Sequence, residues 1–503
     1  MKNKIILICT LGLLLISMIS CDDKLEENVY SELLASNGYT TVEDAESLIT
    51  SVYSSLKGND WGTYYEMSLL QISELPTDYG QDTWSGGSDP YEIGTWGNNE
   101  QYTNEVWVGA YAVVASANFA LSVLEGMNID DQIRAGYIAE AKFLRALAYY
   151  DLTFNFKDVI LNLGETTGDL AVSPQADIIA QIIKDLTEAA PDLPGYATNG
   201  VGRATKGAAL GLRAKTNLNA KNWDTAAADA KAVMDLGEYD LFPSATEIFY
   251  ASNKTDNEWV FAIHSDGSGA GAETQLSWFT LDGTYQNGGW GNLVVTDEFY
   301  KTFDTDDTRR NNMANGYQDG GQNETSPGVF EYHVIPGTPE YTALSTDASV
   351  SISDLDYAPI TKHTGGQNRF DSDPAKSGVN YAVLRYADIL LIRAEALNET
   401  NDQDGAMTVL NIVRDRAGLT GLSGLNQVDL RAAILEERAK ELFMEGHRRV
   451  DLVRSGKHIA LWKAGLEGKY PGGNFSNIDE SKSYYPIPQS EIDANSQLTP
   501  DNN

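Results

Sequence analysis

Apolar residues recur at spacings of three and four over long parts of the chain, which predicts a protein built mainly from amphipathic helices. The first such pattern starts near residue 42 and stops at Gly58, and two longer ones cover 104–125 and 131–156. Asp130 precedes the last of these, where a carboxylate suits the positive end of the helix dipole. These segments predict the first helices of a scaffold.

Two other segments lack the helical pattern and are rich in aromatic residues, glycine and asparagine. They cover residues 59–103 and 241–380. Irregular segments of this length are uncommon inside a compact domain unless they serve a function. We therefore expect an aromatic loop in the first segment, and in the second a lobe of loops, short helices and some strand.

An internal repeat appears when residues 210–236 are aligned with residues 390–416. Arg213 and Arg393 then match, each followed by alanine, and a third Arg-Ala pair begins at Arg145. The helix start that follows Arg213 resembles the second helix of a tetratricopeptide unit. The sequence predicts a mostly α fold, a tetratricopeptide-like helix-pair scaffold with a large irregular loop-rich lobe inserted. Chance alignment of alanine-rich helices is the alternative.

The N-terminus has the pattern of an export leader. Lys2 and Lys4 precede an apolar run over residues 5–19, which is shorter than the roughly 20 residues that a membrane-spanning helix needs. The run ends in Met-Ile-Ser followed by Cys21, which resembles the lipobox of a bacterial lipoprotein. We therefore expect a signal peptide at 1–20 and a lipid on Cys21 that holds the protein at a membrane surface.

Composition excludes several classes of function. The net charge of −36 argues against nucleic acid and mildly favours neutral over polyanionic ligands. Cys9 lies in the leader, so no disulfide is expected in the mature chain. The histidines lack metal-ligand spacing, and no nucleophile-elbow or phosphate-loop string occurs. We expect no metal, no cofactor and no enzymatic activity.

Aromatic side chains are the strongest candidates for ligand binding. Sugar rings present flat C–H faces that stack on indole and phenol rings, and their hydroxyls pair with amides and carboxylates. Five rings lie in glycine- and asparagine-rich stretches without core periodicity: Trp84, Trp96, Trp278, Tyr285 and Trp290. Any one of them could instead fill the core, but we expect at least two to be exposed.

The most specific string of the chain is 437–454, ERAKELFMEGHRRVDLVR. Its pattern predicts a structural helix with Leu442 and Phe443 facing inward. Two charge pairs at helical spacing are expected on its outer surface, Arg438 with Glu441 and Glu445 with Arg449, each contributing a few tenths of a kcal/mol.

This string, together with YPIPQSEI at 485–492, resembles the signature of the SusD/RagB family. The lipobox, the Arg-Ala pairs and the helix-pair organisation are similar to that family as well. The resemblance covers nearly the whole chain. It divides the chain into a signal peptide at 1–20, a lipidated tether at 21–41, a helical scaffold at 42–240 that contains the aromatic loop, an irregular ligand-binding lobe at 241–380 and a C-terminal helical scaffold at 381–503.

The resemblance implies a surface lipoprotein of Bacteroidetes that captures oligo- or polysaccharide. It implies that the protein forms a lid on a SusC-type TonB-dependent outer-membrane transporter. It also implies that the acidic residues after Cys21 direct export to the outer face of the membrane. The string EGHR at 445–448 is implied to be structural. The implied glycan site takes Asp78, Trp84, Trp96 and Asn98 from the early loop, and Trp278, Tyr285 and Trp290 from the lobe.

Three other functions fit the same patterns. The cargo of the protein would be peptide or another nutrient if the tryptophans line a core. A surface glycosidase needs two carboxylates flanking the scissile bond, and a chain this acidic always offers such a pair. A helix-repeat adaptor would bind only proteins.

Overall fold

The structure is a computed structural model. It describes residues 38–57, 64–65, 67–83, 89–164, 168–199, 202–265, 276–280, 290–313, 316–319, 329–332, 350–353, 357–358, 360–363 and 378–499. The leader, Cys21 and the acidic stretch after it lie outside these residues, as do Trp84 and Tyr285. For Trp278 the structure describes the backbone only.

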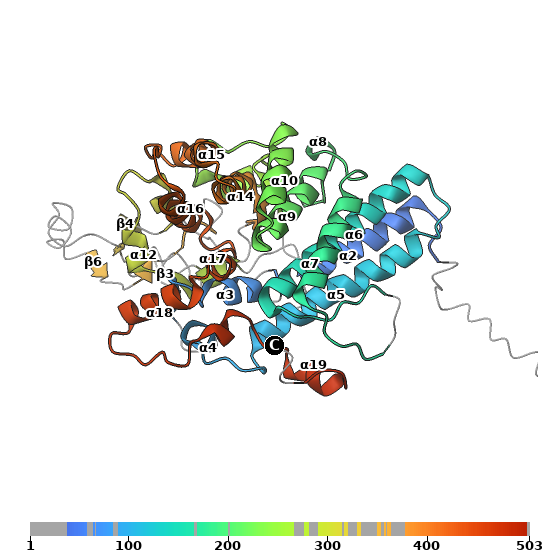
Figure 1. Ribbon diagram of the computed structural model, residues 1–503, viewed down its shortest axis with the longest axis horizontal. Helices are drawn as coiled ribbons and strands as arrows, with labels where there is room; N and C mark the ends of the chain where they lie inside the picture. The colour runs from blue at the N-terminus through green and yellow to red at the C-terminus, as the bar shows by residue number, and fades with distance from the viewer. Residues whose placement is uncertain are drawn as a thin grey trace, which may run out of the picture.

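Four helices form the N-terminal part of the scaffold and lie side by side in Figure 1. The helix α6 begins as the sequence predicts, because the Asp130 carboxylate accepts hydrogen bonds from the backbone N–H groups of Gln132 and Ile133 at 3.0 and 3.1 Å. By length and hydropathy α5 is apolar enough to cross a membrane, but 56% of its most apolar window is buried within the protein. The four helices are α2 (Val42–Lys57), α5 (Gln101–Leu124), α6 (Asp131–Phe156) and α7 (Gln175–Ala189).

The repeat predicted from the sequence is confirmed by two helix pairs in matching register. The first pair begins at residues 206 and 223 and the second at 386 and 403, so both helices recur after the same interval. The two pairs pack on each other through α10 and α14. The pairs are α9 (Lys206–Asn219) with α10 (Trp223–Asp235), and α14 (Tyr386–Glu399) with α15 (Gln403–Arg416).

The Arg-Ala signal has a structural cause. Arg145 of α6 forms an ion pair with Asp185 of α7 at 2.8 Å, and Arg213 of α9 forms one with Asp229 of α10 at 2.6 Å. Arg393 of α14 instead donates to the backbone carbonyl of Ala227 in α10, at 2.9 Å. Each arginine thus joins its helix to a neighbour, while the following alanine is buried and lets the helices approach closely.

Between α10 and α14 the described chain consists of short elements. The strands β2 and β8, near the two ends of this segment, pair antiparallel with each other. Strand β3 pairs with β1 of the early loop. The elements are η2 (Glu247–Phe249), η3 (Ala251–Asn253), β2 (Trp259–Ile263), α11 (Leu276–Thr280), β3 (Leu293–Thr296), α12 (Asp297–Lys301), η4 (Thr308–Asn312), β4 (Gly316–Asp319), β5 (Val329–Tyr332), β6 (Val350–Ser353), β7 (Tyr357–Ala358) and β8 (Tyr381–Arg385).

The early aromatic segment is less irregular than its composition predicts. It contains α3 (Ser68–Glu74), in which all seven residues are buried, β1 (Gly80–Asp82) and α4 (Asp89–Ile93). The polar residues of α3 make it look exposed in the sequence, although Ser68, Gln71, Ser73 and Glu74 are all buried. The hydroxyl of the buried Tyr79 donates to the Glu74 carboxylate at 2.7 Å.

The single helix predicted over 437–454 is wrong, because the chain turns in its middle. Met444 and Gly446 have φ angles of +57° and +81°, so one helix ends and another begins. A Cβ on Gly446 would lie 3.0 Å from the hydroxyl oxygen of Tyr381, so the position also needs glycine for space. The C-terminal elements are α16 (Gln427–Leu442), α17 (Arg448–Ser455), α18 (His458–Lys469), η6 (Glu480–Ser483) and α19 (Gln489–Ala494), and a short α8 (Tyr196–Asn199) lies earlier.

The two surface charge pairs predicted for this string are also wrong, because their members are buried and choose other partners. Arg438 binds Asp451 and Asp388, at 2.7 and 2.9 Å. Glu441 and Glu445 both bind Arg385 of β8, which comes from a distant part of the chain. The fourth member, Arg449, donates to backbone carbonyls of Ser483 and Phe154. Leu442 and Phe443 do face inward as predicted.

Glu74 should make the stability of the protein depend on pH. Burial raises its pKa from 4.5 to about 8, although it accepts hydrogen bonds from the Tyr79 hydroxyl and the Gly446 N–H. Since the folded chain holds this proton more tightly than the unfolded chain, the contribution of Glu74 to stability is complete below pH 4.5 and is lost as the pH rises through about 8.

We expect Glu74→Gln to flatten this dependence. The free energy of unfolding of the wild type should fall between pH 5 and pH 8 by about 3 to 4 kcal/mol more than that of the variant. Denaturant unfolding of both proteins at the two pH values measures the difference. Groups other than Glu74 titrate in both proteins, so their contributions to the pH dependence of the free energy of unfolding cancel in the comparison. An equal pH dependence would contradict a buried, protonated Glu74.

Candidate functional site

Trp290 is an exposed tryptophan held on a rigid base. It lies just before β3, at the edge of the small sheet β1-β3-β7, and 46% of the residue is exposed. Its ring packs edge-to-face on the buried ring of Phe279 in α11, with 5.4 Å between centroids. This arrangement leaves much of the indole in solvent while fixing its position, as a stacking platform for a ligand requires.

The same sheet brings the early loop to Trp290. Asp82 pairs with Leu293 in the β1–β3 register, and the backbone N–H of Thr83 donates to the carbonyl of Asn292 at 3.2 Å. The Thr83 hydroxyl donates to the carbonyl of Gly291, directly after Trp290, at 2.5 Å. Two segments that are about 200 residues apart in the chain therefore meet here, as the sequence prediction of a shared site requires.

Trp96 does not offer its ring to a ligand. Only 4% of the residue is exposed, and its indole is stacked on Trp462 of α18 with 5.4 Å between centroids and 9° between planes. The ammonium of Lys482 lies 4.8 Å from the ring centroid. The expectation of an exposed ring at this position is corrected, because the C-terminal part of the chain covers it.

Asp78 and Asn98 are engaged within the protein. Both carboxylate oxygens of Asp78 accept from Arg448 of α17, at 2.8 and 2.6 Å. The side-chain amide of Asn98 donates to Gln489, whose backbone N–H donates in turn to the Asn98 carbonyl. These two residues join the early loop to the C-terminal scaffold. The string EGHR at 445–448 is buried, as expected of a structural element.

The side chains of the other three predicted rings, Trp84, Trp278 and Tyr285, lie outside the described residues. Trp278 lies on α11 next to Phe279, and its side chain is outside the described residues. Trp84 and Tyr285 are also outside them, although Thr83, the residue before Trp84, is bonded to the backbone beside Trp290. Trp290 is thus the one predicted ring whose exposure the described residues establish.

Sequence reasoning missed a groove that borders Thr83. It has a volume of about 520 Å³ and is open to solvent, and the loop after α18 forms one wall with Tyr470, Asn474 and Phe475. These residues belong to YPGGNF at 470–475, which has the same mixture of aromatic residues, glycine and asparagine as the earlier loops. The signal was present in the sequence, but it was overlooked beside the scaffold signature.

Carboxylates dominate the electrostatics of this groove. Asp82, Asp89 and Glu92 contribute to its lining, and none of its lining residues in the described chain is lysine or arginine. Lys469 forms an ion pair with Glu92. Burial raises the pKa of Glu92, and Lys469 opposes that shift. An acidic lining of this kind disfavours anionic ligands.

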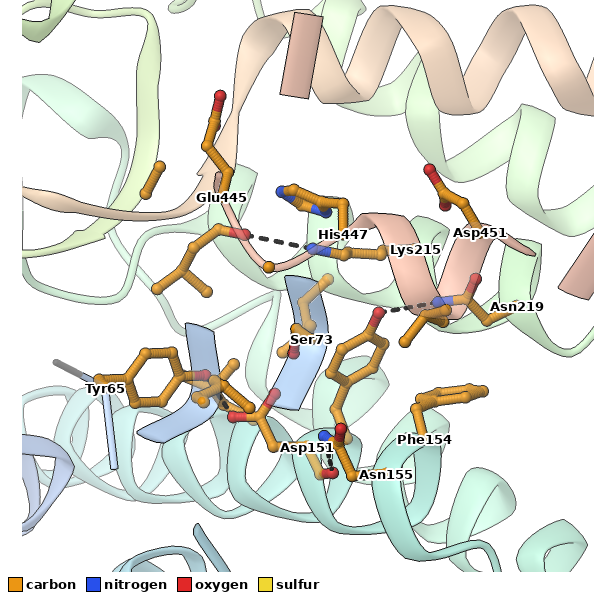
Figure 2. A pocket seen from close by; sticks show the side chains of 18 of the residues that line it. Tyr65, Ser73, Asp151, Phe154, Asn155, Lys215, Asn219, Glu445, His447 and Asp451 are labelled. Carbon is orange, nitrogen blue, oxygen red and sulfur yellow. Dashed lines mark hydrogen bonds between the residues drawn. The ribbon is translucent and has the colours of Figure 1, made fainter. Parts of the chain in front are cut away.

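A second cavity lies inside the scaffold and is drawn in Figure 2. It is lined by Asp151, Lys215 and His447 among others, and its volume of about 40 Å³ suits one or two water molecules and no sugar. Asp151 accepts from the hydroxyls of Tyr64 and Tyr65, at 2.7 and 2.5 Å, and burial raises its pKa to about 6. We interpret this cavity as structural.

The described residues offer no metal centre. Nowhere among them do three histidine, cysteine, aspartate or glutamate side chains gather in a way that would hold a metal ion.

Two family profiles match the chain and together cover most of it. The profile described as "SusD family" matches residues 248–503, and the profile described as "Starch-binding associating with outer membrane" matches residues 24–218. The first match alone spans just over half of the chain.

Individual relatives agree with these profiles. The chain is 28% identical to "SusD-like protein P2" of Formosa agariphila, over 98% of each chain. Among solved structures, a SusD homologue from Bacteroides thetaiotaomicron superposes with a TM-score of 0.78 at 24% identity, over 92% of this chain and 96% of that one. Surface glycan-binding protein A from the same species, in complex with laminarihexaose, superposes with a TM-score of 0.71 at 22% identity, over 92% of this chain and 99% of that one.

Proposed function

Since the chain belongs to the SusD family, we propose that it captures oligo- or polysaccharide at the cell surface without cleaving it. The glycan then passes to a SusC-type TonB-dependent transporter, on which this protein acts as a lid. A lipid on Cys21 holds it to the outer membrane, facing outward.

The half-exposed indole of Trp290 is the observation that supports glycan capture most directly. A sugar ring stacks on such a face, and the Phe279 ring beneath keeps the indole from turning away. The neighbouring backbone is fixed by the β1–β3 pairing, so binding requires little reorganisation of the protein. The glycan complex of one structural relative and the starch-binding description of one matching family agree with this ligand class.

The net charge and the acidic groove support a neutral glycan. The family description that mentions the outer membrane supports the location. The lipobox pattern before Cys21 supports the anchor, and the family as a whole supports the transporter as partner.

Trp290→Ala is expected to weaken glycan binding about 2- to 12-fold, which corresponds to roughly 0.5 to 1.5 kcal/mol for a stacked ring. Affinity electrophoresis across neutral polysaccharides, including starch and laminarin, measures the retardation of the wild type and the variant. Tyr250→Ala is the matched control, because 40% of Tyr250 is exposed and it does not line the groove. Lack of retardation of the wild type on every glycan would refute the proposal.

The non-catalytic part of the proposal has its own test. Incubation of the purified protein with any polysaccharide that retards it should release no new reducing ends. Their appearance at a rate proportional to protein concentration would favour the glycosidase alternative.

A further inference from the structure

The groove beside Thr83 has the size and the lining of a ligand site that is separate from Trp290. Its volume of about 520 Å³ lies within the range of small-molecule pockets. One wall is α4 with the end of β1, and the other wall is the loop 470–477. The two walls come from opposite ends of the chain.

The groove is preformed, because its walls are bonded to each other. The side-chain nitrogen of Asn477 donates to the carbonyls of Ile93 and Gly94, at 3.1 and 3.0 Å. The indole N–H of Trp462 donates to the Glu92 carbonyl at 2.8 Å, and Glu92 accepts from the backbone N–H of Asp82 at 2.9 Å. A ligand would therefore enter a site that is already shaped.

The loop presents an aromatic ring to this groove. Tyr470 is 40% exposed, and the Lys469 ammonium, 4.6 Å from its ring centroid, helps to orient it. Phe475 lies 6.5 Å from Tyr470, centroid to centroid. Position 472 favours glycine because the φ of Gly472 is +85°, and a Cβ on Gly473 would displace the Phe475 ring, which lies 2.6 Å from its position. The loop thus holds the rings of Tyr470 and Phe475 near each other, and the glycines between them have no side chains that would cover these rings.

The polar lining suits hydroxyl groups without charge. Thr95 and Asn474 supply a hydroxyl and an amide that both donate and accept hydrogen bonds, and the Thr83 hydroxyl, whose proton goes to the Gly291 carbonyl, accepts them. The carboxylates of Asp82 and Asp89 accept from hydroxyls and repel anions. Rings, amides and carboxylates together are the groups that recognise a neutral sugar, and the acidic lining opposes uronic acids and phosphates.

We propose that this groove is a second carbohydrate subsite, which binds a neutral sugar unit of the same chain that stacks on Trp290. This inference rests on the proposed function. Thr83 joins the two places, because it lines the groove and its hydroxyl donates to the carbonyl of Gly291, next to Trp290. A glycan that extends past Thr83 reaches Tyr470, and a short one stacked on Trp290 does not.

The test is the dependence of affinity on oligosaccharide length. Isothermal titration uses oligosaccharides of about two to eight units prepared from a polysaccharide that retards the wild type, such as malto-oligosaccharides for starch or laminari-oligosaccharides for laminarin. Tyr470→Ala should weaken binding of the longest oligosaccharides about 2- to 12-fold and leave the shortest unchanged. Tyr470→Phe should retain most of the affinity, because the ring remains. Tyr250→Ala is the control of equal exposure, and thermal unfolding of each variant checks that the fold is intact.

The outcomes separate this inference from the proposed function. Binding that Trp290→Ala weakens and Tyr470→Ala leaves unchanged at every length overturns the second subsite alone. An equal loss for short and long oligosaccharides in Tyr470→Ala also overturns it, because the groove would then belong to the first site. Lack of retardation of the wild type on every polysaccharide of the panel overturns both proposals.

Discussion

Arg385→Met should lower the free energy of unfolding by about 3 to 5 kcal/mol, the largest loss that we expect from a single substitution. The guanidinium is buried and bonds to three carboxylates: Glu258 at 2.5 Å, Glu441 at 3.0 Å and Glu445 at 2.7 Å. Methionine preserves much of the volume but leaves these acids without their shared cation. Although burial by itself raises the pKa of Glu441, Arg416 and Arg385 hold it at about 2, so this acid is charged at neutral pH.

The control for this prediction is a lysine in an exposed pair. Lys231 and Asp235 lie one helical turn apart on the surface of α10, so Lys231→Met should cost less than about 1 kcal/mol. Denaturant unfolding monitored by circular dichroism compares both variants with the wild type. If Arg385→Met cost no more than Lys231→Met, the network would not contribute to stability in the way its burial indicates.

Trp462→Ala should lower the free energy of unfolding by about 3 to 5 kcal/mol as well, because it opens a large cavity in the core. The residue is fully buried, and its ring is stacked between Trp96 and His458, with centroids 5.4 and 5.3 Å away. Its N–H bond to the Glu92 carbonyl joins α18 to α4. The substitution should therefore also loosen the groove beside Thr83 and reduce binding of long oligosaccharides.

Trp290→Ala is the natural comparison for this second prediction. It removes the same side chain from a half-exposed position, so its cost in stability should be below about 1 kcal/mol while its effect on glycan binding is direct. Thermal and denaturant unfolding of the two tryptophan variants measures the contrast. Similar losses of stability in both would mean that Trp290 is part of the core, which would contradict its role as a platform.

The helical scaffold could be predicted in detail from the sequence. The repeat that matches Arg213 with Arg393 corresponds to helices that begin the same distance apart, and the cap at Asp130 marks the start of α6. Such features depend on spacings of three and four residues and on a few local hydrogen bonds. The string at 437–454 was predicted less well, because the positive φ angles of Met444 and Gly446 that end the helix leave no trace in the periodicity.

The candidate site could be predicted only in part. Trp96 and Trp290 lie in stretches of similar composition, yet Trp462 covers the first ring and the second ring remains exposed. Tyr470 was overlooked, although its neighbours have the composition of a binding loop. Its importance depends on Thr83, which is far from it in the chain and lines the same groove.

By itself the sequence determined the helical class, the repeated helix pairs, the family and the acidic charge, because periodicity, motif and composition are properties of the chain that no packing alters. Only the tertiary structure decided which rings face solvent and which charges are buried. The reason is that burial depends on segments that meet across hundreds of residues, as Trp96 meets Trp462 and Arg385 meets Glu258. The local sequence pattern does not encode these long-range contacts, and they decide whether an aromatic ring is exposed to a ligand or buried in the core.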